Sequence, residues 1–112
     1  MSIFEKIIQK EIPANIVFED DLCLAFTDIS PKAPVHILII PKTPIPTAAD
    51  LKPEHASLMG HLMIKATEIA KEQGLAEHGY RLVINCKDHG GQEVYHLHIH
   101  LLGGKKLYGL PV

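Results

Sequence analysis

The sequence of this protein predicts an α+β fold in which five strands form one antiparallel sheet with the helices on one side of it. Three observations lead to this prediction. Five short segments are strand-like, one long segment carries apolar residues at helical spacing, and the order of the segments requires no parallel crossover. A chain of 112 residues leaves little room for a second core, so we expect a single domain spanning residues 1–112.

The amino-terminal segment predicts a short helix followed by a β-hairpin. Pro13 prevents a helix over residues 3–9 from continuing. Residues 16–18 and 22–27 are strand-like and flank the acidic turn 19–21, so we expect two antiparallel strands there. Four apolar side chains form the stripe of the short helix: Ile3, Phe4, Ile7 and Ile8.

The remaining segments predict three strands and one long helix. Residues 35–40 are almost all β-branched or leucine, as in a central strand buried on both faces. The proline-rich residues 41–53 predict a loop, and residues 58–70 repeat apolar side chains every three or four positions, as a helix does. Residues 80–85 and 94–102 are strand-like and are separated by a glycine-containing turn.

The composition excludes several classes of function. A formal net charge of −2 and a single arginine, Arg81, give no polyanion-binding face, so nucleic acid is not an expected partner. No apolar run approaches the ~20 residues that span a bilayer, so we expect no membrane partner either. Cys23 and Cys86 stand in apolar stretches without motif spacing and predict two free thiols. We expect a cytoplasmic protein.

The three histidines of residues 95–102 alternate strictly with apolar residues. In a strand, this alternation would send the imidazoles of His96, His98 and His100 to one face. Packing does not require three polar rings on the same face, so the row indicates a function. Same-face residues along a strand lie ~6.6 Å apart, so His96 and His100 would be ~13 Å apart, too far to share one zinc ion. A pair of them with a distant ligand such as His36 remains an alternative zinc site.

Catalysis fits the row better than metal binding, because imidazole is a nucleophile and titrates near neutral pH. One imidazole attacking phosphorus would form a covalent intermediate, and a second would supply the proton that a leaving amine requires. Just upstream, residues 89–93 contain Gly90 and Gly91. They form either a plain hairpin turn or a turn whose backbone N–H groups hold a phosphate.

Residues 90–104 resemble the signature of the histidine-triad (HIT) superfamily, and most closely its Hint branch. The likeness extends to residues 4–8, 11–13, 28–31 and 36–41, so it covers nearly the whole chain. Hint proteins are nucleotide-binding homodimers that hydrolyse purine nucleoside 5′-phosphoramidates and related aminoacyl- or acyl-adenylates without metal. The resemblance implies a HIT-like fold, a sheet extended across a homodimer, a purine nucleotide substrate, and no metal or cofactor.

The resemblance also implies roles for the histidines. His98 falls on the nucleophile of the family, and the backbone carbonyl of His96 is expected to keep the other ring nitrogen of His98 protonated. His100 and His36 fall on the flanking histidines, which bind phosphate oxygens and help to relay a proton to the leaving amine. The other four histidines match no catalytic position and are expected on the surface or on a helix face: His55, His61, His78 and His89.

Substrate-binding residues follow from the same resemblance. Asn85 falls beside the phosphate and Asp28 at the ribose hydroxyls, although Asp28 could equally order a turn. In the glycine turn, the backbone of Gly91, Gln92 and Glu93 falls at the phosphate, and the role of the Glu93 side chain stays open. Five residues fall on an apolar slot for the purine, and on pattern alone they would be core: Ile3, Phe4, Ile7, Phe26 and Ile29.

The sequence thus predicts a hydrolase that cleaves a phosphorus–nitrogen bond through a nucleotidyl-histidine intermediate at His98. Two alternatives remain. One is a dinucleoside polyphosphate hydrolase or nucleotidyl transferase using the same nucleophile, and the other is a regulatory module that binds a nucleotide or zinc without turnover.

Overall fold

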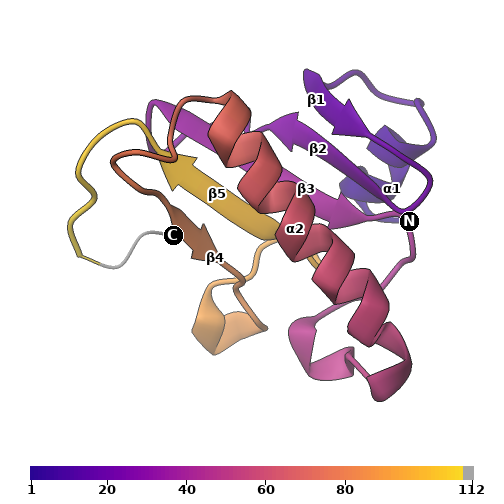
Figure 1. Ribbon diagram of the computed structural model, residues 1–112. Coiled ribbons are helices and arrows are strands. Elements are labelled where there is room, and N and C mark those ends of the chain that lie inside the picture. Colours follow the sequence, from indigo (N-terminus) through magenta and orange to yellow (C-terminus); the bar gives the residue numbers. More distant parts are fainter. Residues whose placement is uncertain (110–112) are drawn as a thin grey trace.

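The computed structural model describes residues 1–109 and contains one antiparallel sheet with a helix against each face (Figure 1). The last three residues of the predicted domain lie outside the described ones. The strand order in the sheet is β1-β2-β3-β5-β4, and every neighbouring pair is antiparallel, as predicted. The elements are α1 (Ile3–Ile8), β1 (Ile16–Glu19), β2 (Cys23–Thr27), β3 (Val35–Pro41), α2 (Ala56–Glu72), β4 (Arg81–Val83) and β5 (Ile99–Gly103).

The two helices cover opposite faces of the sheet, so the prediction that both lie on one side is wrong. Along β2, Cys23 and Ala25 pack with the buried face of α2, whereas Leu24 and Phe26 pack with Phe4 of α1. The central strands are apolar on both faces, and each face must be covered to remove it from water. The short α1 supplies the second cover, and its first turn is stabilised by the reciprocal hydrogen bonds of a capping box between Ser2 and Glu5.

The last two strands are shorter than the sequence predicts. Of the predicted strand 80–85 only residues 81–83 join the sheet, and of the predicted strand 94–102 only the part from residue 99 onward does. Of the three triad histidines, His100 alone therefore lies in a strand. Residues 94–98 leave the strand ladder because other partners take their backbone groups. The Leu97 N–H donates to the Ile45 carbonyl (2.7 Å), and the His96 carbonyl accepts from the ring of His98 (2.7 Å).

The proline-rich segment after β3 is also more ordered than a plain loop. Pro41 still belongs to β3, and two short 3₁₀ helices follow at Ala48–Asp50 and Pro53–His55. The second leads directly into α2, with Pro53 at the first position of a helical turn, where its missing N–H costs nothing. Within residues 1–109, no helix is long and apolar enough to cross a membrane.

Candidate active site

The face of the sheet that α1 covers also carries His36 and His100. In the β3–β5 ladder, His36 lies opposite Leu102 and His100 lies opposite Leu38, so the two histidines are diagonal neighbours on one face. Their rings are 5.2 Å apart, and the His98 ring lies 4.9 Å from that of His100. All three side chains are buried. His36 is 64 positions from His100 in the sequence, so the fold brings two distant segments together.

Hydrogen bonds fix which nitrogen of each ring carries a proton. The backbone N–H of Lys32 donates to Nδ1 of His36 (3.0 Å), so the proton of a neutral His36 lies on Nε2. Nε2 of His36 therefore donates to Nδ1 of His100 (2.9 Å), which leaves the His100 proton on Nε2. The Nε2–H group of His100 stands at the end of this chain of hydrogen bonds and donates to no group within residues 1–109.

His98 is held in the opposite sense. Its Nδ1 lies 2.7 Å from the carbonyl oxygen of His96, and because a carbonyl only accepts, Nδ1 must carry the proton. Nε2 of His98 is then left with its lone pair, as a nucleophile requires. The expected contact with the His96 carbonyl is therefore present.

The side chain of His96 points away from this chemistry. Its Nε2 donates to the carbonyl of Pro41 at the end of β3 (2.7 Å), and the ring is almost completely buried. Its Nδ1 is a buried nitrogen without a hydrogen-bond partner among the described residues. The His96 ring thus ties residues 94–98 to the central strand, and the contact of His96 with the predicted nucleophile runs through its backbone.

The electrostatics of the cluster favour neutral rings. Burial lowers the pKa of His98, against the effect of its hydrogen bond to the His96 backbone. Burial also lowers the pKa of His36, and the Asp28 carboxylate partly opposes this. Burial, together with the neighbouring His98 and His36, lowers the pKa of His100 to about 4. The site therefore presents one lone pair and one N–H donor at neutral pH rather than a row of cations.

The predicted purine slot divides into a buried floor and an exposed rim. Phe4 meets the edge of Phe26 (ring centres 5.4 Å apart) and the ring of His98 (5.0 Å), and Ile7 packs in the same cluster. Ile3 and Ile29 are instead 50% and 94% exposed. Phe4, Ile7 and Phe26 are core, as their pattern also allowed, whereas Ile3 and Ile29 keep much of their apolar surface in solvent.

Asp28 follows β2 and lies at the edge of the histidine cluster. Its Oδ1 accepts from the backbone N–H of Ser30 (2.8 Å), so it does order a turn, while its Oδ2 lies 3.6 Å from Nε2 of His36. Ligand atoms of Asp28, His36 and His100 lie within 4.8 Å of one another, which is the spacing of a metal site. Both ring nitrogens of His36 are already engaged, however, so metal binding there would break the Lys32 or the His100 contact.

The loop of residues 85–93 is held largely by its own hydrogen bonds. The side chain of Gln92 is buried and bonds three backbone groups, namely the Lys87 N–H (2.8 Å) and the carbonyls of Pro46 (2.8 Å) and Val94 (3.0 Å). The backbone N–H groups of Gly91 and Gln92 donate within the loop, to Asp88 and Lys87. Among residues 1–109, the Glu93 N–H has no such partner, so it remains available to an anion.

The remaining features of the loop are conformational. Asn85 donates from Nδ2 to the carbonyl of Gly90 (2.7 Å), which closes the loop across its base. Gly91 has a left-handed conformation (φ 78°) that L-residues rarely adopt. The loop therefore combines a glycine-dependent turn with an amide side chain at its base.

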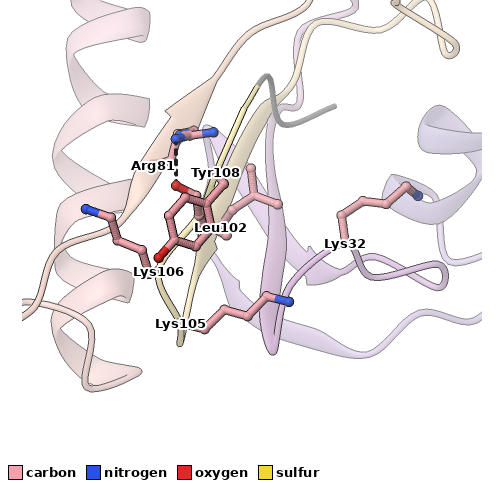
Figure 2. A pocket seen from close by; sticks show the side chains of 7 residues that line it. Lys32, Arg81, Leu102, Lys105, Lys106 and Tyr108 are labelled. Atoms are coloured by element: carbon pink, nitrogen blue, oxygen red, sulfur yellow. Dashed lines mark hydrogen bonds between the residues drawn. The ribbon is translucent and has the colours of Figure 1, made fainter.

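A cavity of about 250 Å³ continues the same face of the sheet toward β4 (Figure 2). Leu102, which lies opposite both His36 and Arg81 in the ladder, forms part of its wall. The guanidinium group of Arg81 donates hydrogen bonds to the carbonyls of Gly109 (2.9 Å) and Leu107 (3.4 Å). Four of the seven lining residues are basic and none is acidic, so this end of the face attracts anions: Lys32, Arg81, Lys105 and Lys106.

Two important contacts could not be found by reading motifs. The backbone N–H of Lys32 and the carbonyl of Pro41 fix the tautomers of His36 and His96, yet backbone groups carry no residue-type signal. The sequence indicates these positions only indirectly, because Lys32 follows the predicted turn 28–31 and Pro41 follows the predicted strand 35–40.

Comparison with known proteins agrees with this geometry. The family model described as the HIT domain matches residues 9–107. A purine nucleoside phosphoramidase of Escherichia coli is 57% identical over 106 residues, covering 95% of this chain and 89% of that protein. A HIT-like protein of Synechococcus elongatus is 60% identical over 110 residues, covering 98% of this chain and 96% of that protein.

Solved structures agree as well. The crystal structure of a HIT family hydrolase from Legionella pneumophila superposes with a TM-score of 0.95 at 51% identity and covers 96% of each chain. A histidine triad protein from Clostridium difficile gives a TM-score of 0.92 at 44% identity, covering 96% of this chain and 94% of that one. The match of sequence and fold shows that this chain belongs to the HIT domain family.

Proposed function

We propose that this protein is a hydrolase that cleaves the phosphorus–nitrogen bond of purine nucleoside 5′-phosphoramidates and accepts related aminoacyl- or acyl-adenylates. The observation that carries the proposal is the opposite protonation of two neighbouring rings. His98 offers a lone pair on Nε2, while His100, 4.9 Å away between ring centres, offers an N–H group. The 57% identical phosphoramidase of Escherichia coli supports the substrate class.

In the first step, Nε2 of His98 attacks phosphorus and the phosphorus–nitrogen bond breaks. The His96 carbonyl accepts from Nδ1–H and so stabilises the positive charge of the nucleotidyl-imidazole ring. The departing nitrogen must gain a proton. As the anionic substrate binds, its phosphoryl group favours uptake of one proton from the buffered solvent by the His36–His100 pair, and the Asp28 carboxylate favours this uptake further. The pair passes this proton to the amine and returns to neutrality.

In the second step, water attacks the nucleotidyl-His98 and releases the nucleoside monophosphate. The neutral His36–His100 pair takes the proton of the attacking water, which restores the charged pair, and His98 recovers its lone pair. Over one turnover the two steps balance. The hydroxyl of water ends on phosphorus, and its proton replaces the one that the His36–His100 pair gave to the amine. No metal or cofactor takes part in the proposed steps.

The substrate would lie across the face that α1 and the 85–93 loop border. The purine would lie against the exposed rim formed by Ile3 and Ile29, above the Phe4–Phe26 floor. Asp28 Oδ2 would accept a ribose hydroxyl, since its other oxygen is held by Ser30. The Glu93 N–H and the Asn85 amide would face the phosphate, with the Glu93 side chain turned to solvent.

The reaction is tested with adenosine 5′-phosphoramidate in the presence of a chelator, following release of AMP. We expect turnover by the wild type and by His78→Ala, a matched control in which an exposed histidine outside the cluster and outside the 85–93 loop is removed. His98→Ala should lose turnover. When the wild-type reaction is stopped without acid, which would break a phosphorus–nitrogen bond, the nucleotide should be found covalently bound to His98. Turnover by His98→Ala would overturn the assigned nucleophile, and faster cleavage of a dinucleoside polyphosphate would overturn the substrate class.

We also propose that two copies associate through α2 and β4. β4 is an edge strand of the sheet, and α2 leaves Met63 and Ile64 exposed by 40% and 60%. Pairing β4 with its copy would extend the sheet and bury both features in one isologous contact. Sedimentation at micromolar concentration should show a dimer that Ile64→Asp dissociates and Val17→Asp, on the other edge strand, leaves intact. A wild-type monomer would contradict this proposal.

A further inference from the structure

A second cluster of potential metal ligands lies on the face of the sheet that α2 covers, opposite the histidine triad. A carboxylate oxygen of Asp20, Sγ of Cys23 and a ring nitrogen of His61 all lie within 4.8 Å of one another. Asp20 and Cys23 belong to the turn between β1 and β2 and to the start of β2, whereas His61 belongs to the first half of α2. His61 lies on a helix face, as the sequence predicted, and its ring is directed at the β1–β2 turn.

The carboxylate of Asp20 is already aimed at the other two groups. Its Oδ1 accepts from the backbone N–H groups of Leu22 and Cys23 (both 2.8 Å), which fixes the orientation of the side chain. Its Oδ2 is then directed at Nε2 of His61, 2.7 Å away. Little rearrangement is needed to bring oxygen, nitrogen and sulfur around one centre, so most of the entropic cost of assembling three ligands has been met by folding.

The donor set suits a particular class of ion. One carboxylate oxygen, one imidazole nitrogen and one thiolate sulfur are ligands that Zn²⁺ and Co²⁺ accept together in tetrahedral geometry. A carboxylate and a thiolate carry two negative charges, so a divalent ion leaves the cluster neutral, which favours burial. The side chains of Asp20 and His61 are each 28% exposed, so solvent has access to these two ligands, whereas Cys23 is buried.

Two ammonium groups near the cluster have carboxylate partners of their own. Lys42 pairs with Glu19 (2.8 Å), and Lys65 pairs with Glu68 (3.0 Å) while its ammonium group lies 5.1 Å from the Phe18 ring centre. Neither hydrogen-bonds to Asp20 in the described structure. Neither lysine therefore occupies the position between Asp20, Cys23 and His61.

We propose that Asp20, Cys23 and His61 bind one divalent metal ion of the zinc class, with water as the fourth ligand. On binding, the Cys23 thiol releases its proton to solvent, and the His61 proton moves from Nε2 to Nδ1 so that Nε2 can coordinate. The ion replaces the Asp20–His61 hydrogen bond and joins the β1–β2 turn to α2. This site is independent of the proposed phosphoramidase chemistry.

The test uses the full chain, freed of metal with a chelator that is then removed, and titrated with Co²⁺. A cobalt–thiolate bond gives a charge-transfer absorption in the near ultraviolet that oxygen and nitrogen ligands do not give. We expect this band to saturate at one ion per chain, to disappear in Cys23→Ser and to persist in Cys86→Ser. Adding Zn²⁺ should remove it by displacement. No band in the wild type, or a band that survives in Cys23→Ser, would overturn the proposal.

Two further variants separate metal binding from folding and from the triad. Asp20→Asn keeps an oxygen for the Leu22 and Cys23 amides but loses the charge, and it should weaken cobalt binding by ~10–100-fold or more. His100→Gln disrupts the other cluster, Asp28–His36–His100, and should leave the band unchanged. Zn²⁺ should raise the melting temperature of the wild type but not of Asp20→Asn. An equal rise in both would overturn the assignment of Asp20.

Discussion

Nε2 of His36 lies 2.9 Å from Nδ1 of His100, in a buried contact between residues 64 positions apart in the chain. The Lys32 N–H on the far side of the His36 ring gives this contact a direction, because it forces the His36 proton toward His100. A backbone group thus sets the polarity of a side-chain pair that faces the proposed substrate.

Replacing Lys32 by proline removes this N–H group and should free the His36 tautomer. A net hydrogen bond contributes ~1 kcal/mol, so we expect kcat to fall by roughly five- to tenfold. Lys32→Ala keeps the N–H group and is the matched control. Imidazole ¹⁵N chemical shifts should show a mixed tautomer at His36 only in Lys32→Pro. Equal kcat in the two variants would contradict the role of the amide.

Stability should fall as the pH drops from 6.5 to 4. The pKa of His100 is about 4 in the fold against an ordinary 6.5, so in this interval the unfolded chain binds a proton that the folded chain does not. Folding therefore loses up to ~3 kcal/mol from this group as the pH falls. Urea unfolding at several pH values measures the loss. His100→Asn should flatten the dependence, and an unchanged slope would argue against burial of a neutral His100.

Ile29→Ser should separate ligand binding from folding. Ile29 is 94% exposed, and surface substitutions change stability by no more than ~0.5 kcal/mol, so the melting temperature should stay within a few degrees. If Ile29 forms the rim against the purine, loss of this apolar contact should raise KM by ~5–30-fold with kcat little changed. Val17→Ser, an exposed apolar residue on β1, should change neither quantity. An unaltered KM in Ile29→Ser would remove Ile29 from the substrate site.

Gln92→Glu should destabilise the protein although it is nearly isosteric. The Gln92 amide nitrogen donates to the carbonyls of Pro46 and Val94, and a carboxylate would oppose oxygen to oxygen at both contacts. An unsatisfied buried group costs ~1–3 kcal/mol, so we expect a loss of ~2–4 kcal/mol in the free energy of unfolding. Glu93→Gln, on the exposed neighbour, is the control. A stability equal to wild type would show that this network is dispensable.

Local pattern was sufficient to predict most of the elements. The apolar periods of α1, α2 and the central strands appear in the sequence because each must bury a face, and their bounds in the structure lie close to those predicted. The strand prediction was wrong where backbone groups hydrogen-bond to partners other than a neighbouring strand. Residues 94–98 alternate as a strand does, yet Ile45 and the ring of His98 take their hydrogen-bonding groups.

The sequence by itself determined that three imidazoles stand near an apolar core and a glycine turn, because residue types and spacing are local properties. Only the tertiary structure decided what each ring does. The protons of His36, His98 and His100 are placed by the Lys32 amide, the His96 carbonyl and the ladder that brings β3 beside β5. The Asp20–His61 contact likewise joins a turn to a helix. Such partners are set by packing between distant segments, and no spacing in the chain encodes a distance across the fold.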